Sequence, residues 1–175
     1  MKNLILPALL FVFSGAFAQE YLEEASSGYQ GEFNPGLEQT DNALHFLVLG
    51  DFGRHGQYHQ KAVAEQMGAA AITLDIDFIL SVGDNFYPNG IRSVQDPQLK
   101  NSFEDIYTNT KLYEDWYVAL GNHDYKGNIE AQIDYSKVSR RWHMPDEYYK
   151  KTFTLKDGSK VLLVIMDTNP FIDTY

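Results

Sequence analysis

Three short apolar segments of the chain each end in a glycine followed by a residue that carries a side-chain oxygen. The three pairs are Gly50-Asp51, Gly83-Asp84 and Gly121-Asn122. Tyr87 adds a phenol three positions after the second aspartate. Carboxylate, amide and phenol oxygens are hard ligands that suit Mg, Mn or Fe and tolerate Zn. A single Gly-Asp pair after a strand more often forms a structural turn than a functional site. Three such pairs in the same position after apolar segments favour a metal site.

The spacing of these pairs matches a repeating structural unit. Asp51 and Asp84 are 33 residues apart (84 minus 51), and Asn122 follows 38 residues later (122 minus 84). Each interval fits one strand, a loop, a helix and a second loop. In an open α/β sheet, ligands bind where the strands end at their carboxyl termini. We therefore expect these oxygen-bearing side chains to meet in one pocket.

The elements that must position them are visible in the hydrophobic pattern. Near-continuous apolar runs at residues 44–49, 78–82 and 116–120 are typical of strands buried on both faces of a parallel sheet. Between the first two runs, a helix is predicted over residues 58–71. Its apolar face would carry Ala62, Val63, Met67 and Ala70. The order of these elements is βαβαβ once a second helix is placed.

That second helix is predicted to open at Pro97 and to carry Leu99 and Phe103 toward the core. The later part of the chain predicts a short helix followed by a hairpin. These elements are a helical segment at 128–137 and strands at 148–155 and 161–166 joined by a turn at 156–159. The chain is therefore expected to be α/β with an antiparallel addition.

Composition limits the classes of protein to consider. The chain has 175 residues, a formal net charge of -10, 44% hydrophobic residues and no cysteine. This composition is that of a globular domain. An acidic surface disfavours nucleic acid and anionic membrane as partners. Without disulfides, stability must come from the core or from bound ions.

The first 18 residues are predicted to be a secretory signal peptide. Lys2 precedes a mostly apolar stretch, and residues 16–18 form an A-x-A cleavage signature. A membrane anchor is the alternative, but the stretch is shorter than the roughly 20 residues that span a bilayer. We expect a secreted or periplasmic protein, with an irregular lead-in at 19–43 and the folded domain at 44–175.

Several segments resemble the metallophosphoesterases. The three blocks are Gly50-Asp51-Phe52-Gly53, Gly83-Asp84-Asn85-Phe86-Tyr87 and Gly121-Asn122-His123-Asp124. A tyrosine three positions after the second aspartate is similar to purple acid phosphatases. Several stretches are similar to the small, tartrate-resistant type: residues 77–87, 103–105, 127–128, 131–136 and 141–142, Pro145, and residues 148–149. The resemblance covers about residues 44–167. It implies a four-layer αββα sandwich of which this chain supplies the N-terminal part, truncated before the rest.

The resemblance also implies roles for individual residues. Asp51 and Tyr87 would bind a ferric ion, Asp84 would bridge two metals, and Asn122 would bind a divalent ion of iron, zinc or manganese. His123 would donate a hydrogen bond to the phosphate or its leaving oxygen. This dinuclear centre would hydrolyse phosphate monoesters by attack of a metal-bound hydroxide. The substrate would be a small-molecule phosphate ester or a phosphoprotein.

The histidines of this chain differ from those of the family it resembles. The family completes its site with three histidines from later loops, and nothing here matches them. We expect His45 to be a core or edge residue of a strand, His55 and His59 to lie in a solvated loop and helix start, and His143 to be structural or at the substrate rim. Asp124 could orient His123.

The resemblance and this departure leave three interpretations open. The leading one is an acid phosphatase whose 175-residue portion is inactive alone. Another metallophosphoesterase, such as a phosphodiesterase, nucleotidase or pyrophosphatase, is the nearest alternative. A catalytically inactive binding fragment is the third.

Overall fold

The computed structural model describes residues 38–172, which lie within one compact unit of the chain, Pro35–Tyr175. The predicted signal peptide and most of the predicted lead-in lie outside the described residues. Four strands form a parallel sheet in the order β1-β2-β3-β4. They are β1 (Phe46–Leu49), β2 (Phe78–Ser81), β3 (Asp115–Val118) and β4 (Trp142–His143). The predicted βαβαβ order is confirmed, and β4 extends it by one strand that was not predicted.

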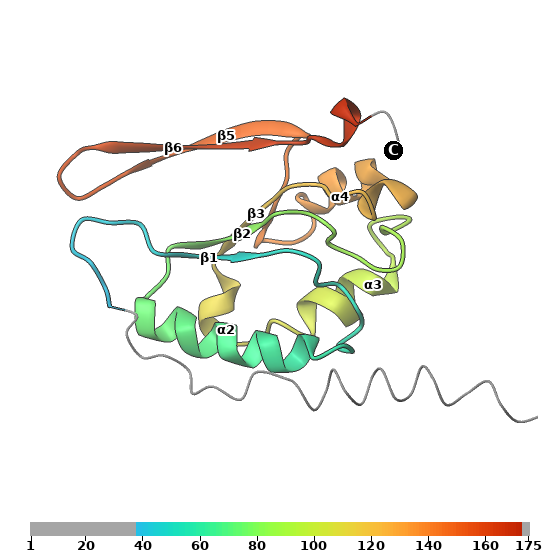
Figure 1. Ribbon diagram of the computed structural model, residues 1–175, viewed down its shortest axis with the longest axis horizontal. Helices are drawn as coiled ribbons and strands as arrows, with labels where there is room; N and C mark the ends of the chain where they lie inside the picture. The colour runs from blue at the N-terminus through green and yellow to red at the C-terminus, as the bar shows by residue number, and fades with distance from the viewer. Residues whose placement is uncertain (1–37, 173–175) are drawn as a thin grey trace, which may run out of the picture. The chain divides into compact units, whose positions relative to one another are not determined.

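The two helices that precede β2 and β3 lie on one side of this sheet (Figure 1). The longest is α2 (Gln60–Leu74), followed by α3 (Pro97–Leu99), which continues as a π-helical turn (Lys100–Glu104). Later come α4 (Ile129–Tyr135) and 3-10 turns at Thr110–Tyr113, Asp124–Lys126 and Asn169–Phe171. The side chain of Asp96 caps α3 by accepting from Gln98 N at 3.0 Å. Within residues 38–172, none of the helices has the length and apolar character needed to cross a membrane.

The predicted buried face of α2 was partly wrong. Ala62 and Val63 are exposed, whereas Ala64, Gly68 and Ala71 are buried. Small residues at this spacing let the helix backbone approach its neighbours closely. A Cβ at Gly68 would lie 2.7 Å from the Asn109 amide nitrogen, which leaves no room for a side chain. The inward side of α2 therefore carries small residues, and of the predicted set Ala70 is buried and Met67 packs against the core.

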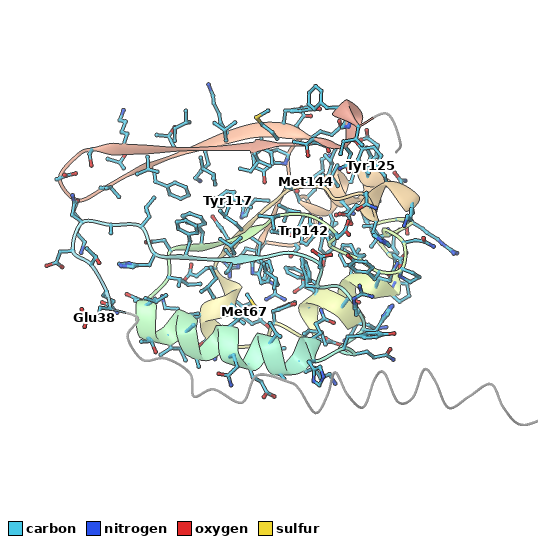
Figure 2. The ribbon with its side chains drawn as sticks, in the orientation of Figure 1. Glu38, Met67, Tyr117, Tyr125, Trp142 and Met144 are labelled. Atoms are coloured by element: carbon cyan, nitrogen blue, oxygen red, sulfur yellow. The ribbon has the colours of Figure 1, made fainter. Side chains whose placement is uncertain are left out.

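A hairpin of β5 (Tyr148–Thr154) and β6 (Lys160–Met166) lies over the other face of the sheet (Figure 1). Its Phe153 ring stacks on Phe78 of β2 with centroids 4.6 Å apart, and Ile165 joins the same cluster. Figure 2 shows Tyr117 in the layer between the sheet and the hairpin and Met67 between the sheet and α2. The described residues thus form three layers, α, β and β, of the predicted αββα sandwich.

The first strand is less buried than predicted. Its Phe46 and Val48 side chains are 42% and 56% exposed. β1 lies at the edge of the four-stranded sheet, and the two-stranded hairpin covers the middle of that sheet rather than its edge. The rule that parallel strands are buried on both faces holds here for β2 and β3 but not for β1.

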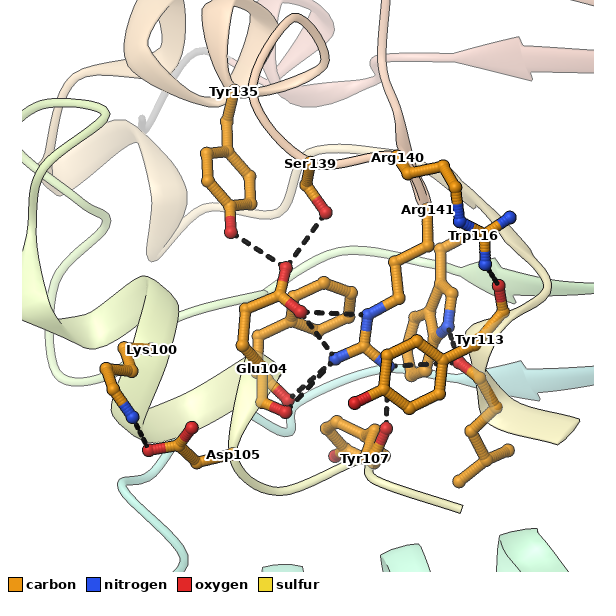
Figure 3. Close-up of polar contacts among 12 residues, drawn as sticks. Lys100, Glu104, Asp105, Tyr107, Tyr113, Trp116, Tyr135, Ser139, Arg140 and Arg141 are labelled. Atoms are coloured by element: carbon orange, nitrogen blue, oxygen red, sulfur yellow. Dashed lines mark hydrogen bonds and ion pairs between the residues drawn. The ribbon is translucent and has the colours of Figure 1, made fainter. Parts of the chain in front are cut away.

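The helical side of the core is organised around a buried arginine, Arg141 (Figure 3). Its guanidinium forms an ion pair with Glu104 at 2.9 Å, and the Arg141 side chain is 2% exposed. It also donates to the backbone carbonyls of Phe103, Glu104, Tyr107 and Leu112 at 2.6 to 3.3 Å. Glu104 in turn accepts from the hydroxyls of Tyr135 and Ser139, each at 2.8 Å. This network ties the start of β4 to the π-helical turn and to α4.

Candidate metal centre

The loops after β1, β2 and β3 pack directly against one another at the carboxyl ends of the strands. Asp51 N donates to the Gly83 carbonyl at 3.1 Å, and Phe52 N donates to the Asp84 carbonyl at 3.3 Å. A Cβ at Gly83 would lie 2.8 Å from Gly121 N, so the second and third loops require glycine where they cross. The predicted convergence of the three Gly-X pairs is therefore confirmed for the backbone.

Both aspartates leave their strands in the left-handed region of backbone conformation. Asp51 has φ 56° and Asp84 has φ 52°. Few non-glycine residues adopt this conformation, and it tends to persist where the surrounding structure requires it. Here it turns two carboxylates out of their strand directions and toward a shared point. That point is the hydroxyl of Tyr87.

Two carboxylate oxygens meet at that hydroxyl. Tyr87 Oη lies 2.5 Å from Asp51 Oδ1 and 2.5 Å from Asp84 Oδ2. Tyr87 and Asp84 are buried, whereas Asp51 is exposed. Burial, followed by the bonds to Asp51 and Asp84, raises the pKa of the Tyr87 phenol above its ordinary value.

This donor set fits a cation. A phenol has one proton, so it cannot donate to two carboxylates at once, and the cluster carries more acceptor oxygens than hydrogens. A multivalent ion satisfies all three oxygens together and removes the repulsion between the carboxylates. Asp51, Asp84 and Tyr87 are therefore brought together in the way the predicted site requires, while their roles as ligands stay a prediction.

His123 completes the cluster from the third loop. Its backbone N donates to Asp84 Oδ1 at 2.8 Å, and its ring packs against the Tyr87 ring with centroids 4.3 Å apart. The His123 Nδ1 atom lies 2.7 Å from the Pro88 carbonyl oxygen. Because a carbonyl only accepts, Nδ1 carries the hydrogen and Nε2 is the nitrogen left for other partners. Lys126 Nζ lies 3.4 Å from that nitrogen.

Asn122 lies on the same loop, immediately before His123. It is half-buried, and its side-chain amide has no hydrogen-bond partner among residues 38–172. The structure thus places this residue beside the cluster, and no contact defines where its amide oxygen binds. Its assignment to a second metal ion stays a prediction.

The expectation that Asp124 orients His123 was wrong. The His123 ring bonds to Pro88, whereas the fully buried Asp124 carboxylate accepts from the backbone N of Asn85 at 3.1 Å and of Gly121 at 2.9 Å. It also accepts from Gln132 Nε2 at 2.9 Å. Burial raises the pKa of Asp124 to about 6, and the bonds from Gly121, Gln132 and Asn85 oppose that rise. Asp124 therefore holds the second and third loops in register beneath the cluster.

Sequence reasoning did not identify Asn85 and Gln132 as part of this support. Asn85 N and Nδ2 both bond Asp124, and Nδ2 also donates to the Ala119 carbonyl at 2.8 Å. The one available signal was a glutamine, Gln132, between the apolar residues of a predicted helix. Its partners lie 8 and 47 residues away, so the pattern alone could not name them.

The other histidines lie elsewhere. His55 and His59 are exposed in the loop that leads into α2, as predicted. His143 pairs with Asp115 at 2.9 Å at the amino end of β3, which is a structural position. His45 precedes β1 rather than lying within it. In residues 38–172, no three or more His, Cys, Asp or Glu side chains form a group that could hold a metal. The cluster described above instead combines two carboxylates with a tyrosine hydroxyl.

The known proteins that this chain resembles agree with the geometry of the cluster. Residues 44–170 match the calcineurin-like phosphoesterase family. The chain is 39% identical over 175 residues to purple acid phosphatase 7 of Arabidopsis thaliana, covering 100% of this chain and 51% of the relative. It is 38% identical over 133 residues to tartrate-resistant acid phosphatase type 5 of Homo sapiens, covering 72% and 41%.

A solved structure shares the fold. GAP50, described as the anchor in the inner membrane complex of Plasmodium, aligns with a TM-score of 0.66 and 27% identity, over 75% of this chain and 44% of that one. The chain thus spans about half, or less, of the length of the relatives it matches.

Proposed function

Since the chain belongs to the calcineurin-like phosphoesterase family, we propose that it forms part of a metal-dependent acid phosphatase that hydrolyses phosphate monoesters. The observation that carries this proposal is the cluster of Asp51, Asp84 and Tyr87 oxygens at the carboxyl ends of parallel strands. Similarity to purple and tartrate-resistant acid phosphatases supports it. The substrate we propose is a small phosphate ester or a phosphoprotein. The enzyme we propose is secreted or periplasmic.

The proposed centre is dinuclear. Asp51 and Tyr87 would hold a ferric ion, Asp84 would serve both metals, and Asn122 would hold a divalent ion of iron, zinc or manganese. When bound, the two ions supply Lewis acidity that activates water and neutralises charge on the transferring phosphoryl group. Without such cations, a chain of net charge -10 would repel a phosphate monoester.

The chain's own residues prepare the site for this chemistry. The Pro88 carbonyl holds the His123 ring with Nδ1 protonated, which directs Nε2 away from the backbone. In the imidazolium form, Nε2 would donate a hydrogen bond to the leaving oxygen; in the neutral form with Nδ1 protonated, Nε2 has no hydrogen to donate. His123 N holds one carboxylate oxygen of Asp84, which leaves the other facing Tyr87.

The test uses the natural full-length protein with a phosphate monoester and a phosphate diester, each of p-nitrophenol. We expect hydrolysis of the monoester at acidic pH, loss of that activity after chelation, and recovery when iron is restored with a divalent ion, because the acidic cluster needs cations to accept a phosphate. Preference for the diester would favour a phosphodiesterase. Hydrolysis that survives complete metal removal would contradict the proposal.

A further inference from the structure

Arg54 lies beside the proposed metal centre in an unusual environment for an arginine. Its guanidinium carbon is 3.6 Å from the centroid of the Tyr87 ring and 5.1 Å from that of Tyr58. The first contact places a permanent positive charge over the face of a proposed metal ligand. Arg54 therefore belongs to the immediate surroundings of the acidic cluster.

The backbone of Arg54 is fixed, although its charged group is not bonded. Arg54 N donates to Oε1 of the buried Gln60 at 3.1 Å, and the Arg54 carbonyl accepts from Gln57 N at 2.9 Å. Among the described residues, the guanidinium forms neither a hydrogen bond nor an ion pair. Asp51 is three residues away in sequence and does not pair with it.

The other arginines with described partners show how different this is. Arg141 uses its guanidinium on Glu104 and on four backbone carbonyls. Arg140 donates to the Tyr113 carbonyl before the amino end of β3. An aromatic contact through the guanidinium face leaves the N–H groups at its edge available, so Arg54 presents an unused planar set of donors next to the site.

We propose that Arg54 is a specificity-determining residue that binds the phosphoryl oxygens of the substrate, which rests on the proposed function above. A guanidinium matches two oxygens of a phosphate with two parallel N–H bonds. A monoester dianion offers more free oxygens and more charge than a diester, so this contact selects for monoesters. Stacking on Tyr87 holds the donors in place before the substrate arrives, which lowers the ordering cost of binding.

The experiment replaces this residue in the natural full-length protein. In Arg54→Gln, we expect KM for p-nitrophenyl phosphate and the dissociation constant of orthophosphate to rise by about ten- to a hundredfold, as for loss of a charged hydrogen-bonding partner. Diester KM should change less, and kcat should change less than monoester KM. In Arg54→Lys, both constants should lie between those of the wild type and of Arg54→Gln, because lysine keeps the positive charge but lacks the two parallel N–H donors of the guanidinium. Metal content should stay at the wild-type level.

Arg140→Gln is the matched control, since it removes the same charge at the opposite end of the parallel strands and should leave both phosphate constants unchanged. Unaltered constants in Arg54→Gln with full metal content would overturn the proposal. So would a changed visible absorption band without a change in phosphate affinity, because Arg54 would then act through Tyr87. The proposed function would be overturned as well if the wild-type protein neither hydrolyses the monoester nor binds orthophosphate. If the wild type is active and Arg54→Gln is unaffected, only the role of Arg54 is overturned.

Discussion

Asp84→Asn is expected to remove metal binding and phosphatase activity together while the protein remains folded. Asp84 Oδ1 accepts a hydrogen bond from His123 N at 2.8 Å, and Asp84 Oδ2 lies 2.5 Å from the Tyr87 hydroxyl. Asparagine keeps an oxygen for the first contact but puts an NH2 group at the second and removes the negative charge. We expect metal affinity to fall by more than the 10–100-fold typical of an outer-shell partner.

Metal content after gel filtration measures this effect, with the urea midpoint measured in parallel to confirm folding. Asp105→Asn is the matched control, because Asp105 is exposed, pairs only with Lys100 among described side chains, and undergoes the same loss of charge. The control should keep its metals. An Asp84→Asn protein with wild-type metal content would show that Asp84 is not a ligand.

The second large effect is on stability. Arg141→Met is expected to lower the free energy of unfolding by about 3–5 kcal/mol, the cost of breaking a buried ion pair by removing one partner. Methionine fills much of the volume but leaves Glu104 without its cation and four carbonyls without a donor (Figure 3). Because this network joins β4, the π-helical turn and α4, the loss should affect the whole unit rather than one loop.

Urea unfolding of the natural full-length protein checks this value, provided that the slope of the transition is unchanged. Arg140→Met serves for comparison: Arg140 is exposed, so its loss should cost less than about 1 kcal/mol. A similar small loss in Arg141→Met would mean that the buried pair contributes little beyond its packing.

The parts of the fold that were predicted from sequence depend on strong local signals. Continuous apolar runs located β2 and β3, and the turn at 156–159 located the hairpin, because each signal extends over several residues. Parallel topology then placed the Gly-X pairs at one edge of the sheet. The parallel topology alone therefore predicted that Asp51 and Asp84 lie close together, without any information about side-chain conformation.

The parts that were missed depend on distant partners. β4 has two residues, too few to produce a recognisable pattern, and it is held by pairing with β3. The support beneath the cluster links Asp124 with Asn85, 39 residues earlier. The position of Arg54 over Tyr87 depends on side-chain rotamers, which no spacing of residues encodes. Sequence could therefore name the proposed ligands but not the residues that hold or flank them.

Visible absorption of the natural full-length protein and its Tyr87→Phe variant tests the central claim most directly. If Asp51, Asp84 and Tyr87 hold a ferric ion, the wild type should show a tyrosinate-to-iron charge-transfer band. Phenylalanine keeps the ring that packs against His123 and Arg54 but removes the hydroxyl, so the band should be absent from the variant. Iron-loaded wild type without the band, or a variant that retains it undiminished, would contradict the account.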